Sequence, residues 1–257
     1  KLILDLALNH TSTSNNWFID SAQLKEDFRG FYQWGNHETQ SSAINETKFW
    51  YPYGSHVYSY YAKFGSSMPE LNYAYSDTRA AVSAVALNWL EFGVDGFRMD
   101  VCNLFSKAEG LPDIGEDGPE GIYMNGPKIH DYLHEMNKEV LSKYDIMTVG
   151  ETPGVSPKHA RDYVGEDRDE LNMVFHFELM DLPNDSDKFY RKPYKLTDIK
   201  NIFMKWYDGL ENIGWNSLFM NNHDQPRMVS RFGNDSKYRI ESAKMLAVSY
   251  LFLKGTP

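Results

Sequence analysis

Residues 94–105 read VDGFRMDVCNLF. The apolar residues of this stretch predict a short buried strand that ends near Asp100. Arg98 and Asp100 interrupt the apolar pattern two positions apart, so they project from the same face of the strand. An ionised carboxylate is costly to bury unless it is paired. The arginine is therefore predicted to keep Asp100 ionised at the rim of a sheet.

Four further segments have the length and apolar content of short buried strands, and helical patterns separate them. Strands that alternate with helices predict an α/β fold with a parallel sheet. The five predicted strands cover residues 2–8, 94–100, 146–151, 173–177 and 217–221. Apolar stripes with helical spacing cover residues 82–90, 129–141, 199–206 and 245–251, and another helix is expected to start near residue 156.

A long interval, residues 11–75, separates the first predicted strand from its helix. It is rich in aromatic, serine and asparagine residues and has little helical periodicity. Insertions of this size are usually functional or form a small subdomain. We therefore expect residues 11–75 to form an inserted small domain, and residues 1–10 and 76–257 to form the main domain.

Composition excludes several classes of partner. The formal net charge is −10 and no run of Lys or Arg occurs, which argues against nucleic acid and anionic membrane surfaces. No apolar run reaches the ~18–20 residues that a membrane-spanning helix needs. Cys102 is the single cysteine, so no internal disulfide forms, and a cytoplasmic location is expected.

Polar groups follow the predicted strands, at the end of a parallel sheet where chemistry gathers. One strand-end acid often caps a helix, but three acids from different strands predict a carboxylate site. Paired carboxylates suit glycoside hydrolysis, which needs one protonated and one ionised acid. The strand-end groups are Asn9, His10, Arg98, Asp100, Glu151, His223 and Asp224, with His176 and Glu178 as more ambiguous members.

Four stretches, DLALNH, GFRMD, VGET and NNHDQ, resemble in this order the four signature regions of the α-amylase superfamily of glycoside hydrolases. The likeness covers essentially the whole chain. It implies a (β/α)8 TIM barrel, incomplete here because only about strands 3 to 7 are matched, with a small domain inserted after the third strand. The chain is therefore expected to be a fragment of a longer catalytic domain.

The resemblance also implies a retaining mechanism that requires no cofactor. Asp100 would be the nucleophile, Glu151 the general acid/base, and Asp224 a third carboxylate that grips sugar hydroxyls and stabilises the transition state. Some family members bind Ca²⁺ near the position of Asn9. The expected sugar-binding residues are His10, Arg98, His223, Val101, Gln225 and Arg227.

Within the superfamily, GPKIHDYLHEMN, WNSLF and NNHDQPRMVSRFGND resemble the oligo-1,6-glucosidase, dextran glucosidase and trehalose-6-phosphate hydrolase group. Val101 resembles α-1,6-acting members, whereas MPELN at 68–72 replaces that group's usual QPDLN and resembles amylase-type members. A retaining α-glucosidase acting on short oligosaccharides is the expected function. Trehalose-6-phosphate hydrolase and an α-1,4 hydrolase stay open as alternatives. A non-catalytic transporter subunit is remote, since all three acids are present.

Other residues have both structural and functional interpretations. Asp5 lies inside a predicted strand and could be a buried structural group or a substrate contact. His130 and His134 have the i, i+4 spacing of a zinc helix, but they lack the His-Glu-x-x-His order and are expected on a solvated flank. The many aromatic residues of the insertion could stack on sugars, but more often such residues form the core of a small domain.

Overall fold

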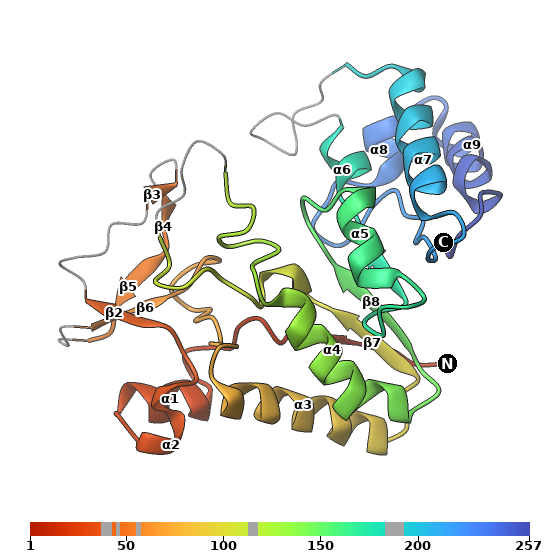
Figure 1. The fold of residues 1–257 in the computed structure, drawn as a ribbon. Helices are drawn as coiled ribbons and strands as arrows, with labels where there is room; N and C mark the ends of the chain where they lie inside the picture. The colour runs from red at the N-terminus through yellow and green to blue at the C-terminus, as the bar shows by residue number, and fades with distance from the viewer. Residues whose placement is uncertain (37–42, 45–46, 55–57, 113–117, 183–192) are drawn as a thin grey trace. The chain divides into compact units, whose positions relative to one another are not determined.

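The computed structural model describes residues 1–36, 43–44, 47–54, 58–112, 118–182 and 193–257. Contacts divide the chain into two compact units, Lys1–Glu151 and Thr152–Pro257. Figure 1 gives the order of the helices and strands in both units.

The first unit contains the predicted parallel sheet. Its strands β1 (Ile3–Leu6), β7 (Gly96–Met99) and β8 (Met147–Glu151) are parallel neighbours, with β7 in the middle. The pairing register places Asp5 beside Arg98. Phe97 and Met99 of β7 are fully buried, so the apolar part of the opening stretch lies in the core as predicted.

Two helices of this unit follow the predicted apolar stripes. Helix α3 (Ser76–Glu91) buries Val82, Ala86 and Leu90, because these residues recur on one face of the helix. Helix α4 (Ile129–Glu139) ends two residues before the predicted limit and continues as the short 3₁₀ helix η2 (Leu141–Lys143).

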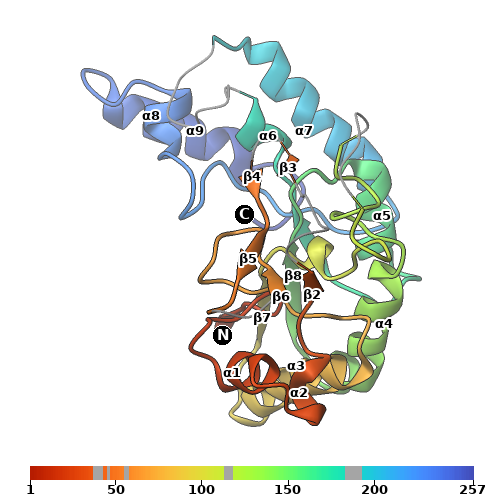
Figure 2. The same cartoon turned by 90° about the vertical axis from the view of Figure 1, so that its left-hand side faces the viewer.

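An antiparallel sheet lies in sequence between β1 and α3. Figure 2 shows its central strand β6 beside β5, and aromatic side chains such as Phe18, Tyr32 and Tyr60 are buried next to it. These aromatics therefore form a core, as the structural interpretation predicted, while the boundaries of a separate domain at 11–75 stay a prediction. The elements are α1 (Asn16–Ala22), α2 (Glu26–Arg29), β2 (Trp34–Asn36), β3 (Ala43–Ile44), β4 (Thr47–Lys48), β5 (Trp50–Pro52) and β6 (Tyr58–Tyr61).

The second unit is mostly helical, and it differs from the sequence prediction at two strands. Strand β9 (Met173–Phe175) is shorter than predicted because Phe177 adopts helical dihedral angles and begins the next helix. Residues 217–221 form only an isolated bridge, Ser217 to Thr256, in place of a regular strand. The helices are α5 (Pro157–Val164), α6 (Glu178–Asp181), α7 (Leu196–Leu210), α8 (Met228–Phe232) and α9 (Arg239–Leu251).

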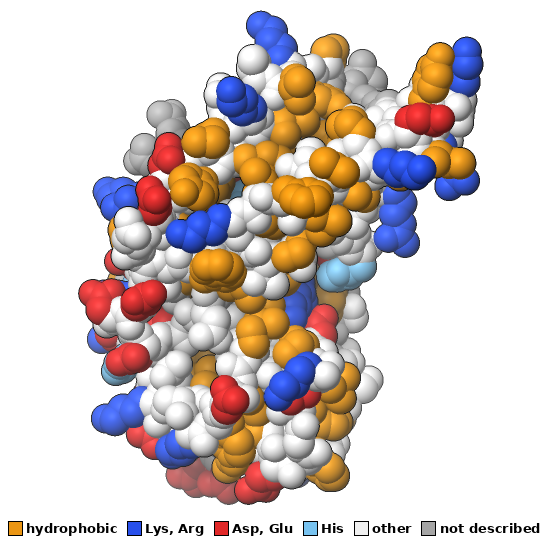
Figure 3. Space-filling model, turned by 90° about the vertical axis from the view of Figure 1, so that its right-hand side faces the viewer, with side chains coloured by type: hydrophobic (Ala, Val, Ile, Leu, Met, Phe, Trp, Pro, Cys, Tyr) orange, Lys and Arg blue, Asp and Glu red, His pale blue; other side chains and the backbone are white. Residues whose placement is uncertain are grey.

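Helix α9 has an apolar core face and an apolar solvent-exposed face. Leu246 packs into a core with Met180, Ile199 and Phe232. On the outside of α9, Ile240, Met245, Val248 and Leu251 are exposed. Figure 3 shows exposed hydrophobic side chains on the face that it views. Among the helices of the described residues, none combines the length and the apolarity that crossing a bilayer requires.

Gly96, the first residue of β7, is predicted to be essential for pairing with β8. Its φ is +152°, and an added Cβ would lie 1.9 Å from the carbonyl oxygen of Met147. Gly65 also has a positive φ, +119°, but nothing lies within 4 Å of its added Cβ. Gly65→Ala should therefore cost about 1–2 kcal/mol from backbone strain alone, whereas Gly96→Ala should cost at least about 3 kcal/mol. Urea unfolding measures the free energy of unfolding of both variants. Equal losses of stability in the two variants would contradict the close approach of β7 and β8.

Candidate active site

Arg98 connects three carboxylates in the first unit. Its Nη1 donates to Asp5 Oδ1 at 2.8 Å and to Asp100 Oδ1 at 2.6 Å, and its Nη2 donates to Glu151 Oε2. This arrangement follows from the fold, because Arg98 lies on the middle strand and the acids belong to both neighbouring strands and to the strand end. The predicted pair Asp100 and Glu151 therefore meets at one guanidinium.

The two acids of this pair have different surroundings. The side chain of Asp100 is 21% exposed, whereas that of Glu151 is only 8% exposed. Burial raises the pKa of Glu151 to about 7; the charge of Arg98 opposes this shift and that of Asp100 adds to it. Two neighbouring carboxyl groups in such different environments are suited to act as a proton donor and an anion.

Val101, directly after Asp100, has an unusual backbone conformation. Its φ and ψ are 33° and 44°, the left-handed region, which is an outlier for a β-branched residue. Such strain costs on the order of 1–3 kcal/mol and concentrates at functional sites. In this conformation the N–H of Val101 lies 3.3 Å from Glu151 Oε2 and donates to it. The strained residue therefore links the strand that carries Asp100 to Glu151.

The position of Asp5 differs from one of its two sequence interpretations. A buried, backbone-bonded role was one expectation for Asp5, but its side chain is 60% exposed and pairs with Arg98. The register of the parallel strands β1 and β7 pairs Asp5 with Arg98. This contact could be predicted from the sequence only if β1 and β7 were already known to be neighbours. Asp5 therefore joins the charged cluster of Arg98.

Residues after β1 hold the insertion to the sheet. The backbone of Asn9 accepts from Leu71 N, and His10 forms an isolated bridge with Glu70 of the MPELN motif. Glu70 is fully buried and pairs with Lys107 at 2.8 Å. The motif that differs from the expected QPDLN thus carries a buried ion pair, a structural role that the sequence analysis did not identify.

Asn9 was the candidate calcium ligand. Its side chain is fully buried, and neither its Oδ1 nor its Nδ2 has a partner among the described residues. Calcium takes 6–8 oxygen ligands, but the described residues contain no group of three or more His, Cys, Asp or Glu side chains that could hold a metal ion. A calcium ion at Asn9 therefore stays a prediction, and we derive no chemical step from a metal.

The remaining predicted site residues belong to the second unit, Thr152–Pro257. His223 Nε2 and Asp224 Oδ2 are 3.2 Å apart, and both side chains are exposed. Gln225 accepts from Arg231 at 2.8 Å, and Arg227 is exposed at the start of α8. The meeting of Asp224 with the first two acids stays a prediction.

The ambiguous pair from the fourth predicted strand has structural contacts. His176 is buried and stacks on Trp206 with ring centroids 3.7 Å apart, and burial lowers its pKa to about 3. Glu178 accepts from Trp206 at 3.1 Å and pairs with Lys205. Both residues therefore take part in the packing of α7 against the segment after β9.

Comparison with known proteins identifies the family of this chain. All 257 residues match the family described as Alpha amylase, catalytic domain, so the chain belongs to this family. It is 49% identical over 271 residues to an oligo-1,6-glucosidase of Bacillus cereus, and the match covers 100% of this chain and 48% of that protein. The family expected from the four signature stretches is confirmed.

Solved structures of related enzymes also match this chain over its whole length. A trehalose-6-phosphate hydrolase of Bacillus licheniformis matches with a TM-score of 0.92 and 37% identity, over 100% of this chain and 48% of that chain. The isomaltulose synthase SmuA of Protaminobacter rubrum matches with a TM-score of 0.92 and 35% identity, again over 100% and 48%. The chain thus spans about half the length of the relatives it matches.

Proposed function

We propose that this chain forms part of the catalytic domain of a retaining α-glucosidase that hydrolyses short oligosaccharides, most favourably at α-1,6 bonds. The arrangement of Arg98 between Asp100 and the buried Glu151 carries this proposal. The 49% identity to an oligo-1,6-glucosidase supports the substrate class. The parallel strands would belong to an incomplete (β/α)8 barrel, about strands 3 to 7, and a cytoplasmic location is part of the proposal.

In the first step, Glu151 gives its proton to the glycosidic oxygen while an oxygen of Asp100 attacks the anomeric carbon. The bond to the leaving sugar breaks, and a covalent glucosyl ester of Asp100 remains. Arg98 orients Asp100 for this attack through the 2.6 Å contact. The short distance between charged partners is typical of a strong, directional hydrogen bond.

In the second step, the ionised Glu151 accepts a proton from water, and the water oxygen attacks the same carbon and releases Asp100. Two displacements give glucose with its original configuration. Asp224, His223, His10, Gln225 and Arg227 are the proposed contacts to the sugar hydroxyls. No cofactor takes part in this scheme.

A substrate panel tests the proposal in the full-length protein. Isomaltose, maltose and trehalose 6-phosphate are compared by kcat/KM, and we expect isomaltose to be cleaved with α-glucose as the first product. A preference for trehalose 6-phosphate would favour the activity that the Bacillus licheniformis relative carries in its name. Release of β-glucose, or no cleavage of any of the three, would overturn the retaining α-glucosidase proposal.

The pH dependence of the reaction should reflect Glu151. The first step needs this carboxyl protonated, and its raised pKa of about 7 keeps much of it protonated near neutral pH. We therefore expect the rate of glucosylation to fall tenfold per pH unit well above pH 7. Single-turnover rates across pH 5–9 measure this limb, and a rate that stays constant up to pH 9 would contradict the role of Glu151 as the acid.

A further inference from the structure

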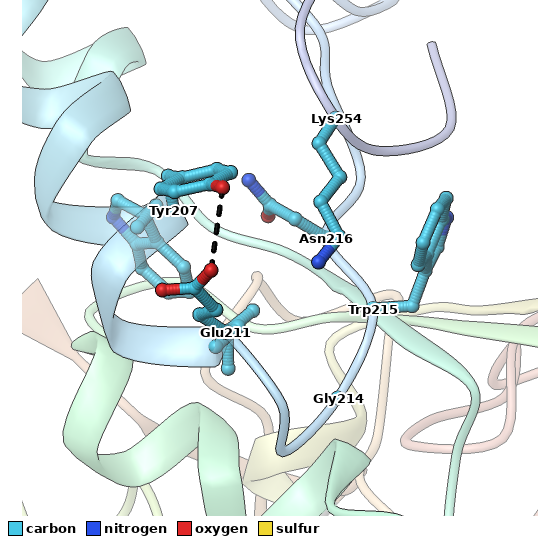
Figure 4. Close-up of a pocket in the computed structure, with 8 residues that line it drawn as sticks. Tyr207, Glu211, Gly214, Trp215, Asn216 and Lys254 are labelled. Atoms are coloured by element: carbon cyan, nitrogen blue, oxygen red, sulfur yellow. Dashed lines mark hydrogen bonds between the residues drawn. The ribbon is translucent and has the colours of Figure 1, made fainter.

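Two groups of polar side chains in the second unit lie outside the proposed hydrolytic residues. The first lines a hollow beside Trp215, where the Tyr207 hydroxyl donates to Glu211 at 3.4 Å (Figure 4). The hollow has space for about one water molecule, and both aromatic residues are exposed, so no ligand site follows from it. The second group is centred on Arg231, a buried residue of α8.

Arg231 is a charged residue beside an apolar core. Only 3% of it is exposed, and its neighbours Met180 and Phe232 belong to the hydrophobic core of this unit. Burial lowers the pKa of Arg231, and the charge of Asp181 opposes this shift. A buried charge is costly to desolvate, and an apolar side chain of similar volume is often equally stable at such a position. Stability alone is therefore a weak explanation for an arginine here.

The guanidinium of Arg231 joins two segments of the chain. Its Nη2 donates to the backbone carbonyl of Met180 in α6, where the last carbonyls of a helix have no partner inside the helix. Its Nη1 donates to Oε1 of Gln225 at 2.8 Å. Gln225 directly follows Asp224, the third carboxylate of the proposed site. Arg231 therefore connects the residue beside Asp224 to the core of the unit.

The loop that carries Asp224 is shaped by local hydrogen bonds. Asn222 Oδ1 accepts from Asp224 N at 2.9 Å, and Asn221 Oδ1 accepts from Met228 N at 3.0 Å. Both bonds lie within the loop and its junction with α8, so they do not hold the loop to another segment. The side chain of Asp224 is 60% exposed, so burial does not fix its position. The contact with Arg231 supplies a connection between this loop and α6.

We propose that Arg231 is a positioning residue for Asp224. Through the side chain of Gln225 it holds the loop in the orientation in which Asp224 binds sugar hydroxyls. This inference rests on the proposed function, which assigns Asp224 to the substrate. Arg231 is not itself a catalytic residue, because it acts through Gln225.

A double-mutant cycle in the full-length protein tests this role. The four proteins are the wild type, Arg231→Met, Asp224→Ala and the double variant. Isothermal titration calorimetry measures the dissociation constant of each for 1-deoxynojirimycin, a glucose-shaped amine. We expect Arg231→Met to weaken binding by about three- to tenfold when Asp224 is present and by less than about twofold when it is absent, because only a carboxylate that is present can be misplaced.

The cycle separates positioning from a general effect on folding. An equal loss in both backgrounds, or no loss in either, would overturn the positioning role of Arg231. A wild type that binds no 1-deoxynojirimycin would instead overturn the proposed function, and this inference with it. The two failures are therefore distinguishable in one set of titrations.

Two further variants complete the experiment. Arg231→Lys keeps the charge but has no planar fork to reach both acceptors. It should show a smaller loss that again depends on Asp224, and it serves as the test if Arg231→Met does not fold. Arg239→Met makes the same chemical change at an exposed residue that begins α9, and it should leave the dissociation constant unchanged. If it weakens binding as much as Arg231→Met, the proposal fails.

Discussion

We expect Asp100→Asn to lower kcat of the full-length protein by at least about 10⁴-fold, because the carboxamide at the proposed nucleophile cannot form the glucosyl ester. The fold should be retained: Arg98 keeps its contacts with Asp5 and Glu151, and the carboxamide oxygen can still accept from Nη1. Rates with isomaltose and a nitrophenyl α-glucoside measure the effect. Since no covalent intermediate can form, a good leaving group should not restore the rate.

The control for this variant is Asp5→Asn. Asp5 bonds the same arginine nitrogen, but it is 60% exposed and is not the proposed nucleophile. Its effect on kcat should therefore be far smaller than that of Asp100→Asn. Near-full turnover in Asp100→Asn, or equal losses in the two variants, would show that the attacking group is another residue.

We expect Glu151→Gln, at the proposed general acid/base, to lower kcat for isomaltose by roughly 10²–10⁴-fold, the usual range for loss of a general acid or base. The leaving-group dependence distinguishes this variant from Asp100→Asn. A nitrophenolate leaves without protonation, so the first step with nitrophenyl α-glucoside should be much less affected than with isomaltose. The burst of nitrophenol in a stopped-flow experiment measures that step, and an equal loss for both substrates would contradict the acid role.

Glu151→Gln should also change how stability depends on pH. In the folded wild type the carboxyl titrates near pH 7, whereas an unfolded glutamate titrates near 4.5. Between these values Glu151 holds more of its proton in the folded than in the unfolded state, so its contribution to the stability of the wild type falls as the pH rises through this window. The glutamine variant lacks this titration, so its free energy of unfolding should decline less from pH 4.5 to 7. Parallel urea titrations at both pH values measure the difference.

Much of the site could be predicted from sequence because its residues follow local patterns. Asp100 comes directly after a run of buried strand residues, and Glu151 is the last residue of β8. In a parallel sheet such positions share one edge, whatever the detailed packing. The pairing of Arg98 with Asp100 was predicted for the same reason, since alternate residues of a strand share a face.

Other features depend on contacts that no local pattern contains. Asp5 could be placed beside Arg98 only by the β1–β7 register, and Glu70 beside Lys107 only by the way the insertion returns to the sheet. Residues 217–221 have the composition of a strand, but Leu218 alone of them bonds to Thr256 through its backbone, N to O, and the return bond from Thr256 N goes to Asn216 O, just before the stretch. Strand formation requires a partner ladder as well as propensity.

The sequence by itself indicated the family, the parallel strands β1, β7 and β8 and the acids that follow β7 and end β8, because periodicity, strand-end polarity and motif order are local properties of the chain. The tertiary structure decided the protonation of Glu151, the left-handed conformation of Val101 and the burial of Arg231 against α6. A pKa depends on which groups exclude water from a carboxyl, and the burial of Arg231 depends on contacts between distant segments. Both are therefore set only when the chain has folded.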